Sequence, residues 1–335
     1  KQVNAQAFAN NTLLCQHACQ LLKAQQKSQV IIYANTYWSK DLAKLIRCLQ
    51  AIAGVEITQL DLIDDGSSEY QKMYHWQRLT NKEQSADLEA GYQNLKRYLK
   101  GGSNRFLRAL SHRSNTLPRK ISSMFNWHRF FPTTYHMLRM DYLDKPELQQ
   151  LKMHLSGHCK QIKWDYLSSG AFSEKQQALF CKFIGVASSS ATLAQTPSEF
   201  MFIGASELRA SCDLQIAIIA DSLKEQGVIP KHYAQDLQFK GHPHAKFNNK
   251  IAAAHQMVEM SSMIPFESLI MMDKLPKSIG GMESSLYFSL PDSYHIDYIV
   301  FSGSKRQLAE NALIQIMLYL KVITQERIFF EEQFH

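Results

Sequence analysis

The chain has 335 residues, of which 45% are hydrophobic, and carries a net charge of +7. This length predicts about two domains, and this composition excludes an intrinsically disordered protein. No apolar run is long enough to cross a bilayer, and the N-terminal segment lacks the apolar core of a signal peptide.

The N-terminal segment predicts an amphipathic helix with Leu13, Leu14, Leu21 and Leu22 on its apolar face, and the natural start of the chain could be missing. The cysteines are too dispersed for the framework of a disulfide-rich protein. They stand at positions 15, 19, 48, 159, 181 and 212. We therefore expect reduced thiols and a cytoplasmic location.

Strand, helix and strand are predicted over residues 29–35, 39–52 and 55–63, a spacing that indicates a parallel α/β sheet. The second strand leads directly into Asp64 and Asp65. Acidic residues beyond the carboxyl end of a parallel strand lie where open α/β sheets place their active sites. Since adjacent side chains diverge, one aspartate can cap the next helix while the other acts as a base. A purely capping role for both remains open.

Residues 96–131 form a basic stretch in which aromatic side chains alternate with Lys and Arg, and no acidic residue interrupts it up to residue 129. Such a stretch can lie on an anionic membrane surface or a charged glycolipid. It can also contact nucleic acid, but no nucleic-acid motif supports that partner. A solvated basic face over buried aromatic rings explains it somewhat better than either partner does.

A helix predicted over residues 145–160 carries His154, His158 and Cys159. Two histidines four positions apart can bind zinc, but no glutamate stands between them as in metalloproteases, so a metal site is a minor alternative. The run at 187–196, rich in Ser, Ala and Thr, predicts an interdomain linker.

The second half repeats the α/β pattern. Strands are predicted at 199–204, 237–240 and 298–301, and helices at 212–226 and 307–320. We therefore predict two Rossmann-like domains facing across a cleft, without a Walker A or GxGxxG motif. The predicted divisions are an N-terminal domain over 1–190, a C-terminal domain over 191–306 and a segment over 307–335 whose helix crosses back to the first domain.

The segment Ser261–Pro291 carries the strongest signals. It predicts a short helix with Glu267 in its first turn, then a brief strand, the pair Gly280–Gly281 and a second helix beginning at Ser284 and Ser285. Free backbone N–H groups and two hydroxyls at that helix start favour a phosphate, and Glu267 can accept hydrogen bonds from a ribose. Simple capping by the serines remains open.

Basic residues also follow the predicted strand 237–240. Lys240, His242 and His244 crowd one turn without an acid nearby, which favours an anionic partner. Pro243 stiffens the backbone beside His242, so that the imidazole can serve a leaving phosphate.

The motifs DDG at 64–66, FKGHP at 239–243, IPFE at 264–267 and SSLYFSLP at 284–291 together resemble those of the bacterial sialyltransferases of glycosyltransferase family 80. The resemblance implies a GT-B fold and metal-independent, inverting transfer of sialic acid from CMP-sialic acid to a sugar hydroxyl of a surface glycan. It implies no cofactor beyond the donor substrate.

The resemblance also implies residue roles. Asp65 matches the general base and His242 the residue that assists departure of CMP. The donor-binding positions implied are Glu267, Ser284, Ser285, Pro243, Lys240 and Gly204. The acceptor-side candidates are Asp64, Asn35, Trp38 and Ser68.

The departures from the family pattern concern the acceptor. Leu208 stands where relatives carry a tryptophan that stacks on the acceptor sugar, and Trp38 replaces a histidine. A charged or membrane-bound glycan at the inner membrane face would suit the basic stretch. Two alternatives stay open: a CMP-Kdo-using transferase, and a catalytically silent nucleotide- or glycan-binding relative.

Overall fold

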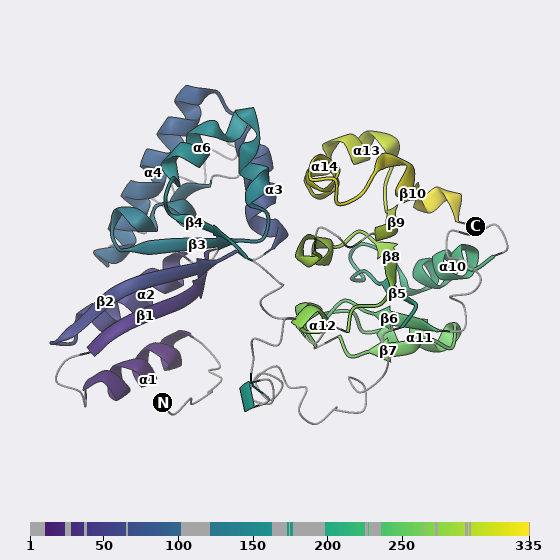
Figure 1. Cartoon of the computed structure of the whole chain (residues 1–335), viewed down its shortest axis with the longest axis horizontal. Helices are drawn as coiled ribbons and strands as arrows, with labels where there is room; N and C mark the ends of the chain where they lie inside the picture. Colours follow the sequence, from purple (N-terminus) through teal and green to yellow (C-terminus); the bar gives the residue numbers. More distant parts are fainter. Residues whose placement is uncertain are drawn as a thin grey trace. The chain divides into compact units, whose positions relative to one another are not determined.

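A computed structural model of the chain describes residues 11–23, 28–36, 39–64, 66–101, 121–162, 173, 175–176, 198–224, 227, 236–262, 264–271, 274–291, 294 and 296–334. They fall into two compact units, Lys1–Ile162 and Lys163–His335, each built on its own parallel sheet (Figure 1). The predicted class, two parallel α/β halves, is therefore confirmed. The predicted linker at 187–196 lies outside the described residues.

The sheet of the first unit has the order β1-β2-β3-β4, with every neighbouring pair parallel. Its strands are β1 (Ser28–Asn35), β2 (Val55–Ile63), β3 (Thr133–Met137) and β4 (Cys159–Gln161). The helices of this unit are α1 (Asn11–Lys23), α2 (Ser39–Gln50), α3 (Ser67–Trp76), α4 (Asn81–Leu99) and α6 (Gln149–His154). Short 3₁₀ turns η2 (Ser122–Phe125), η3 (Trp127–Arg129), η4 (Met140–Asp144) and η5 (Pro146–Leu148) complete it.

Local sequence explains the two best-defined helices of this unit. In α2 the apolar residues Leu42, Ile46 and Leu49 recur at helical spacing and are buried. At the start of α4 the Thr80 side chain accepts a hydrogen bond from Glu83 N–H, and the Glu83 carboxylate accepts one from Thr80 N–H. The two bonds form a capping box. Of the two, α2 begins where the sequence analysis predicts it, at Ser39.

The sheet of the second unit has the order β10-β9-β8-β5-β6-β7 and is also parallel. Its strands are β5 (Phe200–Ile203), β6 (Leu237–Lys240), β7 (Val258–Met260), β8 (Ser278–Met282), β9 (Ile296–Phe301) and β10 (Ile328–Phe330). Its helices are α10 (Cys212–Ser222), α11 (Asn248–Ala254), α12 (Glu267–Met271), α13 (Lys305–Glu310) and α14 (Ala312–Tyr319), and its 3₁₀ turns are η7 (Ser285–Ser289), η8 (Gln325–Arg327) and η9 (Glu331–Gln333).

The strand order of this second sheet reverses between β5 and β8. The chain adds β6 and β7 on one side of β5, and then returns to place β8, β9 and β10 on the other side (Figure 1). Open α/β sheets bind ligands outside the carboxyl ends of their strands at such a reversal. The fold therefore favours a ligand site at the ends of β5 and β8.

Gly280 and Gly281 lie inside β8, and not between a strand and a helix as predicted. A Cβ on Gly280 would meet the Tyr298 ring at 2.8 Å. One on Gly281, where φ is +124°, would meet the carbonyl oxygen of Ile203 at 2.5 Å. The glycines thus permit the close approach of β8 to its neighbours, and their backbone pairs within the sheet instead of remaining free.

The helix predicted at Ser284 is also shorter than expected. It is the five-residue 3₁₀ turn η7, because Leu290 precedes Pro291 and adopts an extended backbone. The argument from a helix dipole at this position is therefore wrong, and only local N–H groups and hydroxyls remain available.

Further predicted helices differ from the structure. Residues 145–160 form η5, α6, a turn and β4, so His158 and Cys159 do not lie on a helix. Residues 307–320 form α13 and α14, because Asn311 has an extended backbone and caps α14 through Ile314 N–H at 3.0 Å. The sequence analysis also missed β3, β4, β7 and β10, of which only β3 exceeds three residues.

The ends of the chain show two more differences. In α1, Leu13 and Leu21 are exposed while Cys15 is buried, so the predicted apolar face is wrong. The segment after residue 306 contributes β10 to the second sheet, and the predicted crossing to the first domain stays a prediction. No disulfide joins the five described cysteines.

We predict that Gly281→Ala lowers the free energy of unfolding by about 3 kcal/mol or more, because the added Cβ meets the backbone of Ile203. Gly157→Ala is the matched control. It also has positive φ but no atom within 4 Å of the added Cβ, so it should cost only about 1–2 kcal/mol. Urea unfolding followed by circular dichroism compares them; equal losses would contradict the close packing of β8 on β5.

Candidate functional site

In the first unit, Asp64 lies at the carboxyl end of β2 and is only 8% exposed. Its carboxylate accepts hydrogen bonds from the Tyr70 hydroxyl at 2.6 Å, from Leu138 N–H at 2.7 Å and from Gly66 N–H at 3.3 Å. Arg139 N–H donates to the same tyrosine oxygen at 2.7 Å. Asp64 therefore connects the residue before α3 with the end of β3, but it does not cap α3, whose N-cap is Gly66 and which has no side-chain cap hydrogen bond.

Asp65 and Trp38 lie outside the described residues. Asn35 ends β1 and pairs in register with Ile63, directly before Asp64. Ser68 lies, half-buried, in the first turn of α3. The described acceptor-side candidates are thus gathered at the carboxyl ends of β1 and β2, where the sequence analysis expects them.

In the second unit, Lys240 is buried at the end of β6. Its ammonium donates to the carbonyls of Ser261 at 2.8 Å and of Ile264 at 2.7 Å. Burial lowers the pKa of Lys240 to about 8, although the negative charges of Glu267 and Glu259 act to raise it. Its ammonium is therefore occupied in holding the loop before α12 against β6.

Glu267 begins α12, and its Oε1 accepts a hydrogen bond from the Ser289 hydroxyl at 2.7 Å. Ser289 closes η7, the turn that begins at Ser285. Ser284 accepts from Leu286 N–H at 3.3 Å, as an N-cap, and Ser285 is exposed. The chain of contacts from Lys240 through the loop to Glu267 and Ser289 brings the predicted donor-side elements together.

His242 follows β6 and is partly buried. Its Nδ1 accepts the backbone N–H of His244 at 3.2 Å, so a neutral ring carries its proton on Nε2. Burial lowers the pKa of His242, and the charges of His244 and Arg209 lower it further. At neutral pH the ring is therefore an uncharged hydrogen-bond donor.

The two remaining donor-side candidates are Pro243 and Gly204. Pro243 is exposed beside His242. Gly204 follows β5 and donates its N–H to the carbonyl of Lys240 at 2.9 Å. A Cβ at Gly204 would meet the Phe239 ring at 2.7 Å, so this position needs glycine for packing.

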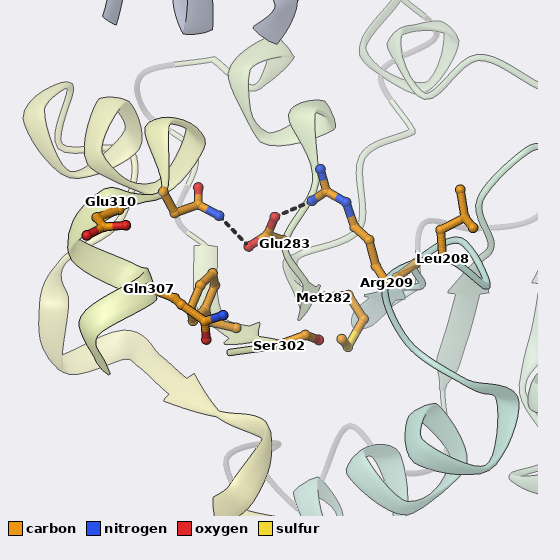
Figure 2. A pocket seen from close by; sticks show the side chains of 10 residues that line it. Leu208, Arg209, Met282, Glu283, Ser302, Gln307 and Glu310 are labelled. Carbon is orange, nitrogen blue, oxygen red and sulfur yellow. Dashed lines mark hydrogen bonds and ion pairs between the residues drawn. The ribbon is translucent and has the colours of Figure 1, made fainter. Parts of the chain in front are cut away.

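A cavity of about 370 Å³ opens at the carboxyl ends of β5, β8 and β9 (Figure 2). Its lining residues come from the loop after β5, the ends of β8 and β9, and α13: Ala205, Leu208, Arg209, Met282, Glu283, Phe301, Ser302, Gln307, Glu310 and Asn311. Leu208, 98% exposed, stands at its rim. The cavity lies at the strand-order reversal of the second sheet.

The Glu283 carboxylate lies in the wall of this cavity. It forms an ion pair with Arg209 and accepts from Asn311 Nδ2 at 3.2 Å (Figure 2). Burial raises the pKa of Glu283, while Arg209 and Asn311 oppose that rise. Sequence reasoning missed all three residues, because they stand 74 and 28 positions apart and form no local motif.

The histidines considered as zinc ligands belong to a packed cluster in the first unit. The His128 ring lies 4.7 Å from that of His154 and 4.4 Å from that of His158, centroid to centroid. His154 and His158 each place a nitrogen near a backbone carbonyl, at 2.9 Å and 3.3 Å. No group of three His, Cys, Asp or Glu suited to a metal occurs within the described ranges.

Part of the basic stretch 96–131 can be compared with its prediction; residues 102–120 lie outside the described ranges. Arg129 lies over the Tyr92 ring at 3.5 Å and pairs with Glu89 at 3.2 Å. Trp127 is fully buried, whereas Lys96 is exposed. This portion has a solvated basic face over buried aromatic rings.

Comparison with known proteins gives one family match. A family model described as "Sialyltransferase PMO188" matches residues 4–328. A search of the curated proteins gives no match. No helix in the described part of the chain is long and apolar enough to span a membrane.

Solved structures resemble the whole chain. An α/β-galactoside α-2,3-sialyltransferase from Photobacterium phosphoreum is 31% identical, over 98% of this chain and 86% of that one, with a TM-score of 0.80. A 2,6-sialyltransferase from Photobacterium sp. JT-ISH-224, solved with CMP and lactose, is 29% identical. The match covers 98% of this chain and 67% of that one, with a TM-score of 0.76. The GT-B domain of a Photobacterium damselae sialyltransferase is 29% identical. The match covers 95% of this chain and 83% of that one, and its TM-score is also 0.76. The GT-B class is thereby confirmed.

We predict that Asp64→Ala costs about 2–4 kcal/mol of unfolding free energy, because it leaves the Tyr70 hydroxyl and Leu138 N–H without their buried acceptor. Asp61→Ala on the same strand is the control, since Asp61 makes a more exposed pair with His136. A double-mutant cycle with Tyr70→Phe, measured by urea unfolding, should give a coupling of about 1 kcal/mol or more. Additive effects would contradict the buried contact.

We predict a loss of stability in acid from the histidine cluster. Burial, followed by the charges of His154 and His158, lowers the pKa of His128 from 6.5 to about 4. The folded state therefore binds fewer protons than the unfolded state in this window, so stability is full above pH 6.5 and falls toward pH 4. Urea midpoints across this range should fall less for His128→Leu than for the wild type. Parallel pH profiles would remove the cluster from the acid response.

Proposed function

The chain belongs to the sialyltransferase family whose model matches residues 4–328, and on that premise we propose that it moves sialic acid from CMP-sialic acid to a hydroxyl of a surface-glycan precursor. The proposed reaction inverts the anomeric centre and needs neither a metal nor another cofactor. The observation that carries the proposal is the geometry of His242, an uncharged Nε2–H donor at the carboxyl edge of the second sheet.

The donor side of this proposal rests on the second unit. CMP lies with its ribose at Glu267 and its phosphate near Ser284, Ser285 and the Nε2–H of His242. The contacts from Lys240 to Ile264 and from Glu267 to Ser289 support this assignment, because they hold these elements together before any ligand binds. Preorganised donors stabilise the charge that grows on a departing phosphate.

The acceptor side rests on the first unit, where Asp65 acts as the general base. Asp64, buried and saturated with hydrogen bonds, positions the backbone before it. Asn35, Ser68 and Trp38 lie on this side in the proposal. With Leu208 in place of a stacking aromatic residue, the acceptor differs from the lactose found in the Photobacterium sp. JT-ISH-224 structure.

The proposed step is a single displacement. Asp65 takes the proton of the acceptor hydroxyl while its oxygen attacks the anomeric carbon of sialic acid. The bond from that carbon to the phosphate oxygen breaks, and the electron pair leaves with CMP, whose oxygen accepts a hydrogen bond from His242. Because attack and departure occur on opposite faces and no covalent enzyme intermediate forms, the configuration inverts.

We also propose that the enzyme works in the cytoplasm, in peripheral contact with the inner membrane face. The support is the exposed basic end of α4, with Lys96, Arg97 and Lys100. Such residues attract anionic lipids or a charged glycolipid acceptor.

The test is transfer from CMP-sialic acid to a panel of glycans, with CMP-Kdo as the alternative donor and sialylated products detected by mass spectrometry. We expect the wild type to turn over CMP-sialic acid. Asp65→Ala should abolish transfer while CMP still binds by calorimetry, because the base contributes nothing to the nucleotide. Wild-type turnover of CMP-Kdo alone, or unchanged turnover in Asp65→Ala, would refute the corresponding assignment.

We further predict that His242→Ala slows transfer by about 10²-fold or more. His244→Ala is the matched control: it keeps the backbone N–H that His242 accepts, so its rate should stay within a few-fold of wild type. Near-normal rates in His242→Ala would exclude this imidazole from the mechanism. Ser284→Ala with Ser285→Ala should weaken CMP binding, and an unaltered affinity would leave the serines as caps only.

A further inference from the structure

Arg209 lines the cavity, and only one of its guanidinium nitrogens has a hydrogen-bond partner in the described part of the chain. Its Nη1 pairs with Glu283, whereas its Nε and Nη2 groups have no hydrogen-bond partner among the described residues. Its side chain is 47% exposed and lines the cavity together with Glu283 and Asn311 (Figure 2). A guanidinium can bind two carboxylates, because its five N–H donors point along different edges of one plane.

Glu283 holds this guanidinium in place. Its carboxylate is only 10% exposed and accepts from both Arg209 and Asn311. Asn311 is itself fixed, because its Oδ1 caps α14. An arginine anchored in this way loses less side-chain entropy on binding a ligand than a mobile one would.

Two observations relate Arg209 to the proposed phosphate position. Its partner Glu283 directly precedes Ser284 in the sequence. The charge of Arg209 also contributes, after burial and His244, to the lowered pKa of His242.

We infer that Arg209 binds the carboxylate carried by the anomeric carbon of the transferred sugar, and so selects donors of the 2-keto acid class over neutral sugars. This inference rests on the proposed function. In such a donor, the carboxylate and the phosphate oxygen are bonded to the same carbon, so a cation beside the phosphate position meets the carboxylate. The remaining cavity lining available to the sugar comprises the polar groups of Ser302, Gln307 and Asn311, the carboxylate of Glu310 and the apolar surface of Ala205, Leu208, Met282 and Phe301.

The experiment measures calorimetric affinities for three ligands. They are CMP, an inert CMP-sialic acid analogue with fluorine beside the anomeric carbon, and the carboxyl methyl ester of that analogue. Arg209→Gln should bind the analogue at least about 10-fold more weakly than wild type, because a charge-assisted hydrogen bond is lost. It should bind CMP within about two-fold of wild type, and the ester should bind both proteins equally.

Two further variants serve as controls. Arg209→Gln leaves Glu283 buried without its cation, so Arg209→Gln/Glu283→Gln is measured beside it and should show the same loss for the analogue alone. Arg306→Gln removes a neighbouring exposed charge on α13 that does not line the cavity, and should change no affinity by more than about two-fold.

Each other outcome overturns the inference. If Arg209→Gln weakens CMP as much as the analogue, the arginine serves the phosphate or the fold. If it weakens none of the ligands while the wild type transfers sialic acid, the carboxylate assignment fails and the proposed function stands. If the wild type binds neither CMP nor the analogue, the proposed function itself fails, and the wild type alone shows this.

Discussion

The arrangement of the second unit depends on one buried cation. The Lys240 ammonium joins the end of β6 to the loop before α12, through the carbonyls of Ser261 and Ile264. From there the carboxylate of Glu267 reaches the hydroxyl of Ser289 in η7. Three segments more than twenty residues apart are thus connected at one edge of the sheet. An ammonium group is stable in the protein interior only when its N–H donors have hydrogen-bond partners. The loop that carries the Ser261 and Ile264 carbonyls therefore has little freedom to move away from Lys240.

The sheet beneath provides the second constraint. Gly280 and Gly281 let β8 approach β5 and β9 more closely than any residue with a Cβ could. The strand order reverses at this same pair of strands, β5 and β8, and the cavity opens at their carboxyl ends. Rigid strands and satisfied polar groups hold Ser284, Glu283 and His242 in fixed positions, which is the form of preorganisation that charge stabilisation requires.

Sequence patterns predicted the elements whose signals are local. The strand Leu237–Lys240 and the short helix at Glu267 were expected and are confirmed, because apolar runs, proline and capping residues act over a few positions. The predicted division of roles between Asp64 and Asp65 is not confirmed: Asp64 accepts from the N-cap residue Gly66 without capping α3, and the role of Asp65 stays a prediction.

What the sequence could not predict depends on distant contacts. The Gly280–Gly281 pair was placed after a strand and before a helix, since glycine alone does not identify a tightly packed strand. The residues Arg209, Glu283 and Asn311 meet only in the folded unit. The helix predicted over 145–160 is interrupted, because Gly157 adopts positive φ and the chain then enters β4; a strand of three residues leaves too short a pattern to detect.

The most direct measurement of the central claim is a crystal structure of the chain with CMP bound. The account predicts a phosphate within hydrogen-bonding distance of His242 Nε2 and of the Ser284–Ser285 turn, with the ribose diol at Glu267. A nucleotide ordered elsewhere on the second sheet, or a phosphate out of reach of both His242 and the serines, would contradict it.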